Sequence, residues 1–422
     1  MEKDRKMYTL SSTLVLPHFV DANGKLTVQA SGDVPIFQWP DGSWNHEANR
    51  FMRELMERRL SRLNRGGSLA TFAAHISHLL RFVWERDLML SEITDSEFTT
   101  FMNALSQPRS GRNSNTVREI GRTCLQLIRS VAAHAGEVDA VSETGRIRIY
   151  VTKTRAGRRE ARSGGGSINH AAFPRRETRH RRMPTTRAAI DALIAASDSV
   201  STSAHQKMRR LTMLRLMEIT GARRGELTSL TTESVKSAMA MEKPMLRLIT
   251  LKTRSDTPPS RLIPITRRDI EFVNTYIEIY RARIVSKHLR TGDHGYLLVN
   301  GRSGRPLQPG TLTLEISKLA AAANLKTRVS PHLFRHRFIT RLFVALIEQH
   351  KMENEDQLRQ ALLEGETLRF KVSQWTGHRN LASLDHYIHL AFDESISSRG
   401  IDLDECMTNA ISSSVGTTRS LS

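Results

Sequence analysis

The sequence predicts a mainly α-helical protein with a small β component, an α+β fold divided into two or three domains. Apolar residues recur at helical spacing through residues 46–136, where short loops join four helices. Strand-like segments occur in residues 1–45 and 245–265. With 422 residues, the chain exceeds a typical domain of roughly 150 residues. These observations predict a helical domain and a separate mixed α and β domain.

Composition restricts the class of protein. Hydrophobic residues make up 39% and charged residues 25% of the chain, and no stretch approaches the ~18 uninterrupted apolar residues of a membrane-spanning helix. The N-terminus has no small-residue cleavage site, so we expect no secretion. Cys124 and Cys406 are too few for a disulfide framework or a four-ligand zinc site. We therefore expect a cytoplasmic protein.

The chain carries a large positive charge. It has 63 Lys and Arg against 43 Asp and Glu, a net charge of +20. Such an excess is typical of proteins that bind the phosphates of nucleic acids. An anionic membrane surface is a competing partner, but the sequence has no long basic amphipathic helix with aromatic anchors. A ribosome-associated or merely solubilising role for the charge stays open.

The first 140 residues are predicted to hold two segments. Residues 1–45 form a β-rich N-terminal extension, with turn signals such as Asn23-Gly24. Residues 46–140 form a compact module of four amphipathic helices. We expect Ser68 to cap the second helix after a Gly-Gly break, and Thr94 to begin the third through a capping box.

Residues 141–183 are predicted to be a basic interdomain linker. Between residues 146 and 187 the chain has 13 Lys and Arg but only two Glu, a net charge of +11. A Gly-rich run and few large apolar residues argue against a packed core. The segment is at least a solvated tether, and a tether this basic also suits a clamp that closes on DNA. The arginines predicted to contact phosphates are Arg175, Arg176, Arg179, Arg181 and Arg182.

Four motifs in residues 184–392 carry candidate chemistry. The sequence has no P-loop, GxGxxG, HExxH, GxSxG or CxxC motif, and no carboxylate cluster for two-metal catalysis. We therefore expect no metal or other cofactor, with cationic side chains balancing a phosphate. The motifs are TGARRGEL, a strand–turn–strand segment with a lysine, SPHLFRH, and a Gly-His pair followed nine residues later by a tyrosine. The candidate residues in them are Arg223, Lys252, His332, Arg335, His378 and Tyr387.

This ordered set resembles the signature of the tyrosine recombinase, or phage integrase, family. Each motif alone is commonly a surface ion pair, a solvated face or a core residue. The resemblance therefore depends on all four motifs occurring in this order in one strongly basic chain. The resemblance covers residues 184–392 well, and residues 46–140 resemble the family's core-binding domain by pattern. It implies a catalytic domain and a helical core-binding domain that form a clamp on double-stranded DNA.

The resemblance also implies a role for each candidate. A tyrosine hydroxyl, with a pKa near 10, is a weak nucleophile at neutral pH. Tyr387 would attack phosphorus once the phosphodiester is held in line and its charge neutralised. Arg223 and Arg335 would bind the non-bridging oxygens as bidentate donors, and His378 would donate to the same oxygens.

Proton transfer falls to two further residues. His332 would accept or relay the tyrosine proton, and Lys252 would protonate the leaving 5′ oxygen. The 3′-phosphotyrosyl product keeps the energy of the phosphodiester, so rejoining needs neither ATP nor metal. The segment LKTRSDTPPSRLIP lacks the Gly-Lys-Gly of many relatives, which leaves Arg254 as an alternative, although arginine is a poor proton donor. The register of the motif favours Arg223 over its neighbour as the catalytic arginine.

The leading hypothesis is a site-specific DNA recombinase or integrase of a mobile element, working as a homotetramer on two DNA sites. A type IB topoisomerase-like enzyme or a hairpin resolvase would share this chemistry. An inert DNA-binding relative would not need Tyr387 or the intact residue set. We expect a bacterial, nucleoid-associated protein, and the sequence does not decide whether accessory recombination proteins are required.

Residues 393–422 are predicted to form a C-terminal tail with a short helix. Leu403, Met407, Ala410 and Ile411 make one apolar stripe. Because about ten residues cannot hold a helix in water alone, this stripe must dock. It docks either on its own domain or, as the resemblance suggests, in trans on a neighbouring subunit.

Overall fold

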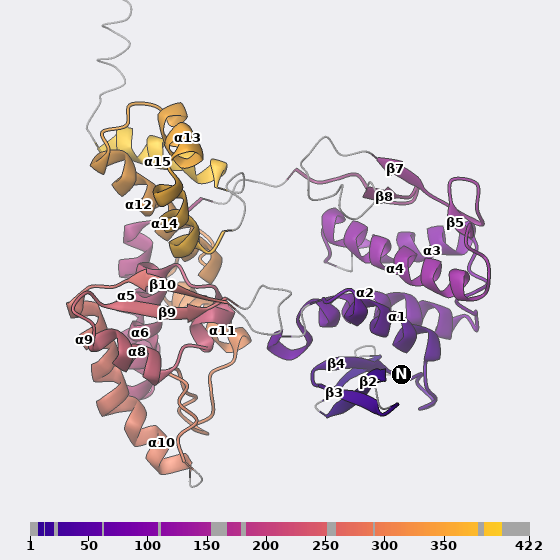
Figure 1. Cartoon of the computed structure of the whole chain (residues 1–422), viewed down its shortest axis with the longest axis horizontal. Helices are drawn as coiled ribbons and strands as arrows, with labels where there is room; N and C mark the ends of the chain where they lie inside the picture. The colour runs from indigo at the N-terminus through magenta and orange to yellow at the C-terminus, as the bar shows by residue number, and fades with distance from the viewer. Residues whose placement is uncertain are drawn as a thin grey trace, which may run out of the picture. The chain divides into compact units, whose positions relative to one another are not determined.

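The computed structural model describes two compact units, unit 1 within residues 7–178 and unit 2 within residues 183–398 (Figure 1). Both are mainly helical, and every sheet in the described ranges has two strands. This confirms the predicted fold class. None of the helices described is long and apolar enough to cross a membrane. The described ranges are 7–11, 13–20, 24–60, 63–108, 111–152, 167–178, 183–250, 259–289, 292–378 and 384–398.

Two antiparallel sheets begin unit 1. β1 (Tyr8–Ser11) pairs with β4 (Val34–Phe37), and β2 (Leu14–Val20) pairs with β3 (Leu26–Ser31). The Phe37 side chain is fully buried among the helices that follow. The first and last of these strands therefore share a core with the helical module.

Four helices follow these strands. They are α1 (His46–Glu57), α2 (Leu63–Glu85), α3 (Asp95–Leu105) and α4 (Ser114–His134). The predicted capping box is present, because the Thr94 hydroxyl accepts from the Glu97 backbone N–H at 3.3 Å and the Glu97 carboxylate accepts from the Thr94 backbone N–H at 2.6 Å. The prediction that Ser68 caps the second helix is wrong, since α2 already begins at Leu63. The chain passes through the expected break because Gly66 adopts a positive φ that other residues disfavour.

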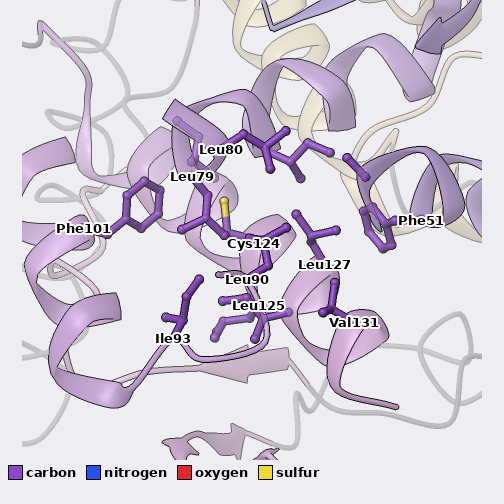
Figure 2. Close-up of a cluster of buried hydrophobic side chains, with 14 of the residues drawn as sticks. Phe51, Leu79, Leu80, Leu90, Ile93, Phe101, Cys124, Leu125, Leu127 and Val131 are labelled. Carbon is purple, nitrogen blue, oxygen red and sulfur yellow. The ribbon is translucent and has the colours of Figure 1, made fainter. Parts of the chain in front are cut away.

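Apolar side chains from these helices meet in one core (Figure 2). Phe51 comes from α1, Leu79 from α2 and Phe101 from α3, and they surround Cys124 and Leu127 of α4. Burial raises the pKa of the Cys124 thiol, which therefore behaves as an apolar side chain.

Two short strand pairs complete unit 1. β5 (Val141–Ser142) pairs in parallel with β6 (Ile147–Arg148), and β7 (Tyr150–Thr152) pairs with antiparallel β8 (Ser167–Asn169). The apolar residues that these segments bury in the helical core are Val141, Ile147, Ile149 and Phe173. This differs from the coreless tether expected over residues 141–183, because four apolar side chains are enough to fix short segments on a preformed helical surface. The domain boundaries themselves stay a prediction.

Unit 2 begins with a helical body around one strand pair. β9 (Met245–Ile249) pairs antiparallel with β10 (Ser260–Pro264), which places Arg261 opposite Leu248. The helical segments are α5 (Arg187–Val200), α6 (Ala204–Thr220), α7 (Arg224–Thr228), α8 (Thr232–Met239), α9 (Arg267–Thr275), η3 (Tyr276–Arg281), α10 (Ala282–His288) and α11 (Pro309–Ala322). Of these, η3 is a π-helix.

The last four helices contain most of the candidate site. They are α12 (Pro331–Gln349), α13 (Glu355–Glu364), α14 (Glu366–Thr376) and α15 (Asp385–Ser398). Phe334 on α12 packs in the core formed with the preceding helices, whereas Ile339 and Phe343 pack in a second core with α13–α15. Because α12 joins the two cores, its side chains can be fixed against both.

Candidate active site

The first predicted arginine follows a glycine turn. α6 ends at Thr220, and Gly221 takes the left-handed conformation with φ +55°. A Cβ atom on Gly221 would lie 2.4 Å from Cδ1 of Phe338, so only glycine fits between this turn and α12. The turn leads directly to Arg223, which precedes α7 and keeps 28% of its side chain exposed. Arg223 is therefore accessible to a ligand.

A buried carboxylate holds Arg223. Glu226 is 1% exposed and accepts from Arg223 Nη1 at 2.6 Å and from the Arg223 backbone N–H at 3.0 Å. It also accepts from Arg261 Nη2 at 2.8 Å. Burial raises the pKa of Glu226, but the charges of Arg261 and Arg223, together with their hydrogen bonds, outweigh it and keep the pKa below its usual value. The carboxylate stays ionised and fixes the direction of both guanidinium groups.

The second predicted arginine lies in the interior on α12. Arg335 is 2% exposed; its Nη1 donates to the Gly221 carbonyl at 3.0 Å and its Nη2 donates to the Thr376 carbonyl. Both acceptors lie at helix ends, where carbonyl groups lack helical partners. Burial, followed by the charges of Arg223 and Arg261, lowers the pKa of Arg335 to about 9, so it remains charged at neutral pH. Among the described carboxylates, none forms an ion pair with it.

His378 follows a second glycine turn. α14 ends at Thr376, the following Gly377 is left-handed with φ +63°, and His378 Nε2 then lies 3.4 Å from Arg335 Nη2. Because a guanidinium can only donate, Nε2 accepts and the ring proton sits on Nδ1, which is buried without a hydrogen-bond partner in the described part of the chain. Burial, then the charges of Arg335, Arg223 and Arg261, lowers the pKa of His378 to about 3. The ring is neutral at pH 7.

The predicted nucleophile packs beside these groups. Tyr387 on α15 is 5% exposed and belongs to the core that α12 forms with α13–α15. Its ring centroid lies 6.2 Å from that of His378, 5.4 Å from that of His386 and 5.1 Å from that of His336. Burial raises the pKa of Tyr387, although two nearby arginines act in the opposite direction. The hydroxyl is protonated at neutral pH and must lose its proton to react.

His332 lies at the exposed start of α12, one turn before His336. Its ring meets the His336 ring edge-on, with centroids 4.5 Å apart. His336 in turn contacts the ring of Tyr387. The two histidines and the tyrosine therefore form a continuous row of rings from the surface to the interior.

Several predicted residues lie outside the described ranges. These are Lys252, its alternative Arg254, and the linker residues Arg179, Arg181 and Arg182. Arg175 and Arg176 are described, and both are exposed. The described residues contain no group of three or more His, Cys, Asp or Glu side chains that could hold a metal ion.

Sequence reasoning missed two residues at the site. Arg261 reaches it from β10, and a signal existed: Arg261 lies two residues before Ile263 in a strand that alternates between buried and exposed positions. That alternation turns an arginine toward the interior. His336 directly follows Arg335 and had no separate signal, because its role depends on packing between α12 and α15.

The chain is similar to known proteins in sequence and in fold. Residues 185–354 match the phage integrase family. The chain is 25% identical over 202 residues to the tyrosine recombinase XerD of Staphylococcus aureus, and equally to that of Staphylococcus saprophyticus. These matches cover 48% of this chain and 57% of each relative, so the chain spans little more than half the length of the curated relatives it matches.

A solved structure agrees in fold. The crystal structure of the XerH site-specific recombinase bound to palindromic difH substrate, a post-cleavage complex, superimposes with a TM-score of 0.51. The two chains are 15% identical over 84% of this chain and 87% of the other. Residues 185–354 therefore form a domain of the phage integrase family, and the chain is similar to tyrosine recombinases in sequence and in fold.

Proposed function

We propose that this protein is a site-specific DNA recombinase that cuts and rejoins strands through a 3′-phosphotyrosyl intermediate. The observation that carries the proposal is the grouping of Arg335, His378 and Tyr387. The buried, charged guanidinium of Arg335 has no ionic partner in the described structure. It lies beside His378, whose Nδ1 has no hydrogen-bond partner there and whose ring contacts the ring of Tyr387. A phosphodiester supplies the anion that such a site lacks.

Each candidate residue that the structure describes takes part in the proposed reaction. Arg335 and Arg223 bind the non-bridging oxygens and neutralise the charge that develops on them. His378 donates a hydrogen bond from Nδ1–H to one of these oxygens. The Tyr387 oxygen attacks phosphorus while its proton passes to the histidine row that ends at His332. The bond from phosphorus to the 5′ oxygen breaks, and this oxygen takes a proton from Lys252, whose role is inferred from the family resemblance.

The proposed substrate is double-stranded DNA held partly by the basic segment after residue 146. Arg176 lines a polar cavity of about 370 Å³ beside the start of α4. The other residues that line this cavity are Asn115, Arg118, Glu119, Arg122 and Glu177. The three arginines that line the cavity outnumber the two glutamates, and this excess of positive charge favours contact with a phosphate.

We further propose that four subunits act on two DNA sites to integrate or excise a mobile element. This rests on the family resemblance and on the retained residue set. Sequencing the DNA that flanks the gene should reveal inverted repeats at the element boundary. Those repeats would define the duplex to be used in cleavage assays.

The direct test is Tyr387→Phe on a nicked suicide duplex, which traps the covalent intermediate. The substitution removes the nucleophilic oxygen but keeps the ring and its packing. We expect DNA binding to persist and the DNA-linked protein band on a denaturing gel to disappear. A band that remains in Tyr387→Phe would refute the assignment. Cleavage and resealing of one duplex without exchange between two would indicate a topoisomerase-like activity instead.

A further inference from the structure

Arg261 is a buried residue that joins several parts of the site. It lies on β10, with 3% of its side chain exposed, and its Nη2 donates to Glu226 at 2.8 Å. The same Glu226 oxygen accepts from the Arg223 backbone N–H at 3.0 Å. The other Glu226 oxygen accepts from Arg223 Nη1 at 2.6 Å. Arg261 and Arg223 therefore share one carboxylate, and neither can move without disturbing the other's partner.

The second guanidinium nitrogen of Arg261 reaches a different element. Nη1 donates to the carbonyl of Trp375 in the last turn of α14. The next carbonyl, that of Thr376, accepts from Arg335. The turn at Gly377 packs directly on this pair: a Cβ atom there would lie 3.2 Å from Arg261 Cδ and 3.6 Å from Arg223 Nη1. Arg261 therefore fixes the turn that presents His378.

We propose that Arg261 is a positioning residue that holds Arg223 and His378 in register for binding the scissile phosphate. The proposal rests on the proposed recombinase function. Arg261 joins three elements that sequence separates: the strand β10, the start of α7 and the end of α14. A guanidinium can do this because its fork reaches a carboxylate and a carbonyl at once, whereas a lysine offers a single ammonium.

A second buried arginine of unit 2 gives a matched control for stability. Arg281 has 3% of its side chain exposed and binds Asp293 through Nη1 at 2.6 Å and Nη2 at 2.5 Å. Its Nε donates to the Tyr296 carbonyl at 2.7 Å. Arg281 thus has the same kinds of partner as Arg261, a carboxylate and a carbonyl, but binds none of the candidate catalytic residues through these bonds.

The test compares Arg261→Met, Arg261→Lys and Arg281→Met in the full chain. Single-turnover cleavage is measured on a nicked duplex with a phosphodiester or an uncharged methylphosphonate at the cleavage position. We expect Arg261→Met to slow phosphodiester cleavage by roughly 10- to 100-fold with DNA affinity little changed, because small misplacements of catalytic groups cost this much. Arg261→Lys should be intermediate. The defect should shrink roughly tenfold on the methylphosphonate, which has less charge to neutralise.

Two results would overturn the positioning role. One is equal slowing by Arg281→Met, which would mean that only stability was lost. The other is the same defect for Arg261→Met on both substrates. If the parent chain forms no covalent DNA product, the proposed function fails, and the crystal structure of Arg261→Met decides the role of Arg261. Arg223 should then leave its 2.6 Å hydrogen bond with Glu226 and the Gly377 turn should shift; unmoved groups would refute the proposal.

Discussion

Arg335 combines nearly complete burial with a charge that no described carboxylate neutralises. Its guanidinium is held by two carbonyl groups instead, those of Gly221 and Thr376. Carbonyl groups orient the cation without cancelling its charge, so its attraction for an incoming anion is kept. Glu226, by contrast, neutralises part of the charge of Arg223 and Arg261. The site therefore combines Arg223, which a carboxylate orients, with Arg335, whose charge is available to an anionic ligand.

The pKa of His378 makes a prediction about pH. In the folded chain this pKa is about 3, compared with 6.5 in the unfolded chain. Between these values only the unfolded chain binds the proton, so the stability that depends on neutral His378 is complete above about pH 6.5 and is lost as the pH falls toward 3. The slope is at most about 1.4 kcal/mol per pH unit.

The measurement is the free energy of unfolding in urea, for the parent chain and His378→Gln, from pH 7 down to the lowest pH at which both fold. We expect the difference between the two to shift in favour of His378→Gln as the pH falls, because glutamine binds no proton. Other histidines titrate in both proteins and cancel in the difference. A difference that does not change with pH would contradict the low pKa.

At the scale of elements, the site is built from two helix ends and from a third helix, α12, that is hydrogen-bonded to both. α6 and α14 each end in a left-handed glycine, and each presents a carbonyl to Arg335 on α12. The two helix ends are more than 150 residues apart in sequence, and one guanidinium joins them. Helix termination by glycine is thus part of how the site is assembled.

Gly221→Ala tests this construction. The substitution forces a side chain into a left-handed position and places Cβ 2.4 Å from the Phe338 ring. The first effect costs roughly 1–2 kcal/mol and the overpacking adds roughly 1–3 kcal/mol. Gly295→Ala in the same unit is the control, because Gly295 has φ +76° but nothing within 4 Å of its Cβ position. Urea unfolding should show a larger loss for Gly221→Ala; equal losses would mean that close packing against α12 is unimportant.

The sequence predicted elements well where a local signal defined them. The capping box at Thr94 follows from residues within one turn. Prediction from the sequence failed where contacts between distant residues determine the structure. α2 continues through two glycines that are typical of a break, and Phe173 is buried by helices far from it in sequence. Arg335, His378 and Tyr387 were predicted by motif order, whereas the contribution of Arg261 depends on a hydrogen bond between β10 and α14.

At the scale of the whole molecule, charge is concentrated where no large core forms. The segment from residue 146 to residue 187 carries +11 of the net +20. Its described parts 146–152 and 167–178 pack on unit 1, and Arg175 and Arg176 remain exposed there. This combination suits a segment that binds phosphates without reading bases.

Replacing Arg175, Arg176, Arg179, Arg181 and Arg182 with Gln tests that role. Binding should weaken to a similar degree on a recombination site and on an unrelated duplex, because phosphate binding carries no sequence information. The slope of log K against log salt concentration should shrink by roughly 0.9 for each phosphate that the protein no longer neutralises. Titrations at four or more salt concentrations measure it. An unchanged slope would leave the segment as a solvated tether.

The C-terminal tail makes the last prediction, which concerns assembly. Residues 399–422 lie outside the described ranges, directly after α15, the helix that carries Tyr387. If the apolar stripe from Leu403 to Ile411 docks on a neighbouring subunit, each tyrosine becomes sensitive to assembly through its own helix. Truncation after Arg399 should then leave binding to one site intact but impair the pairing of two sites and recombination.

A mixing experiment separates docking in trans from docking on the same chain. The truncated chain keeps Tyr387 but has no tail, and full-length Tyr387→Phe keeps the tail but has no nucleophile. Docking in trans predicts that the mixture forms covalent DNA product on paired sites better than the truncated chain does alone, because the inactive partner supplies the missing tail. Docking on the same chain predicts no gain on mixing. Recombination by the truncated chain at the full-length rate would show that the tail serves neither purpose.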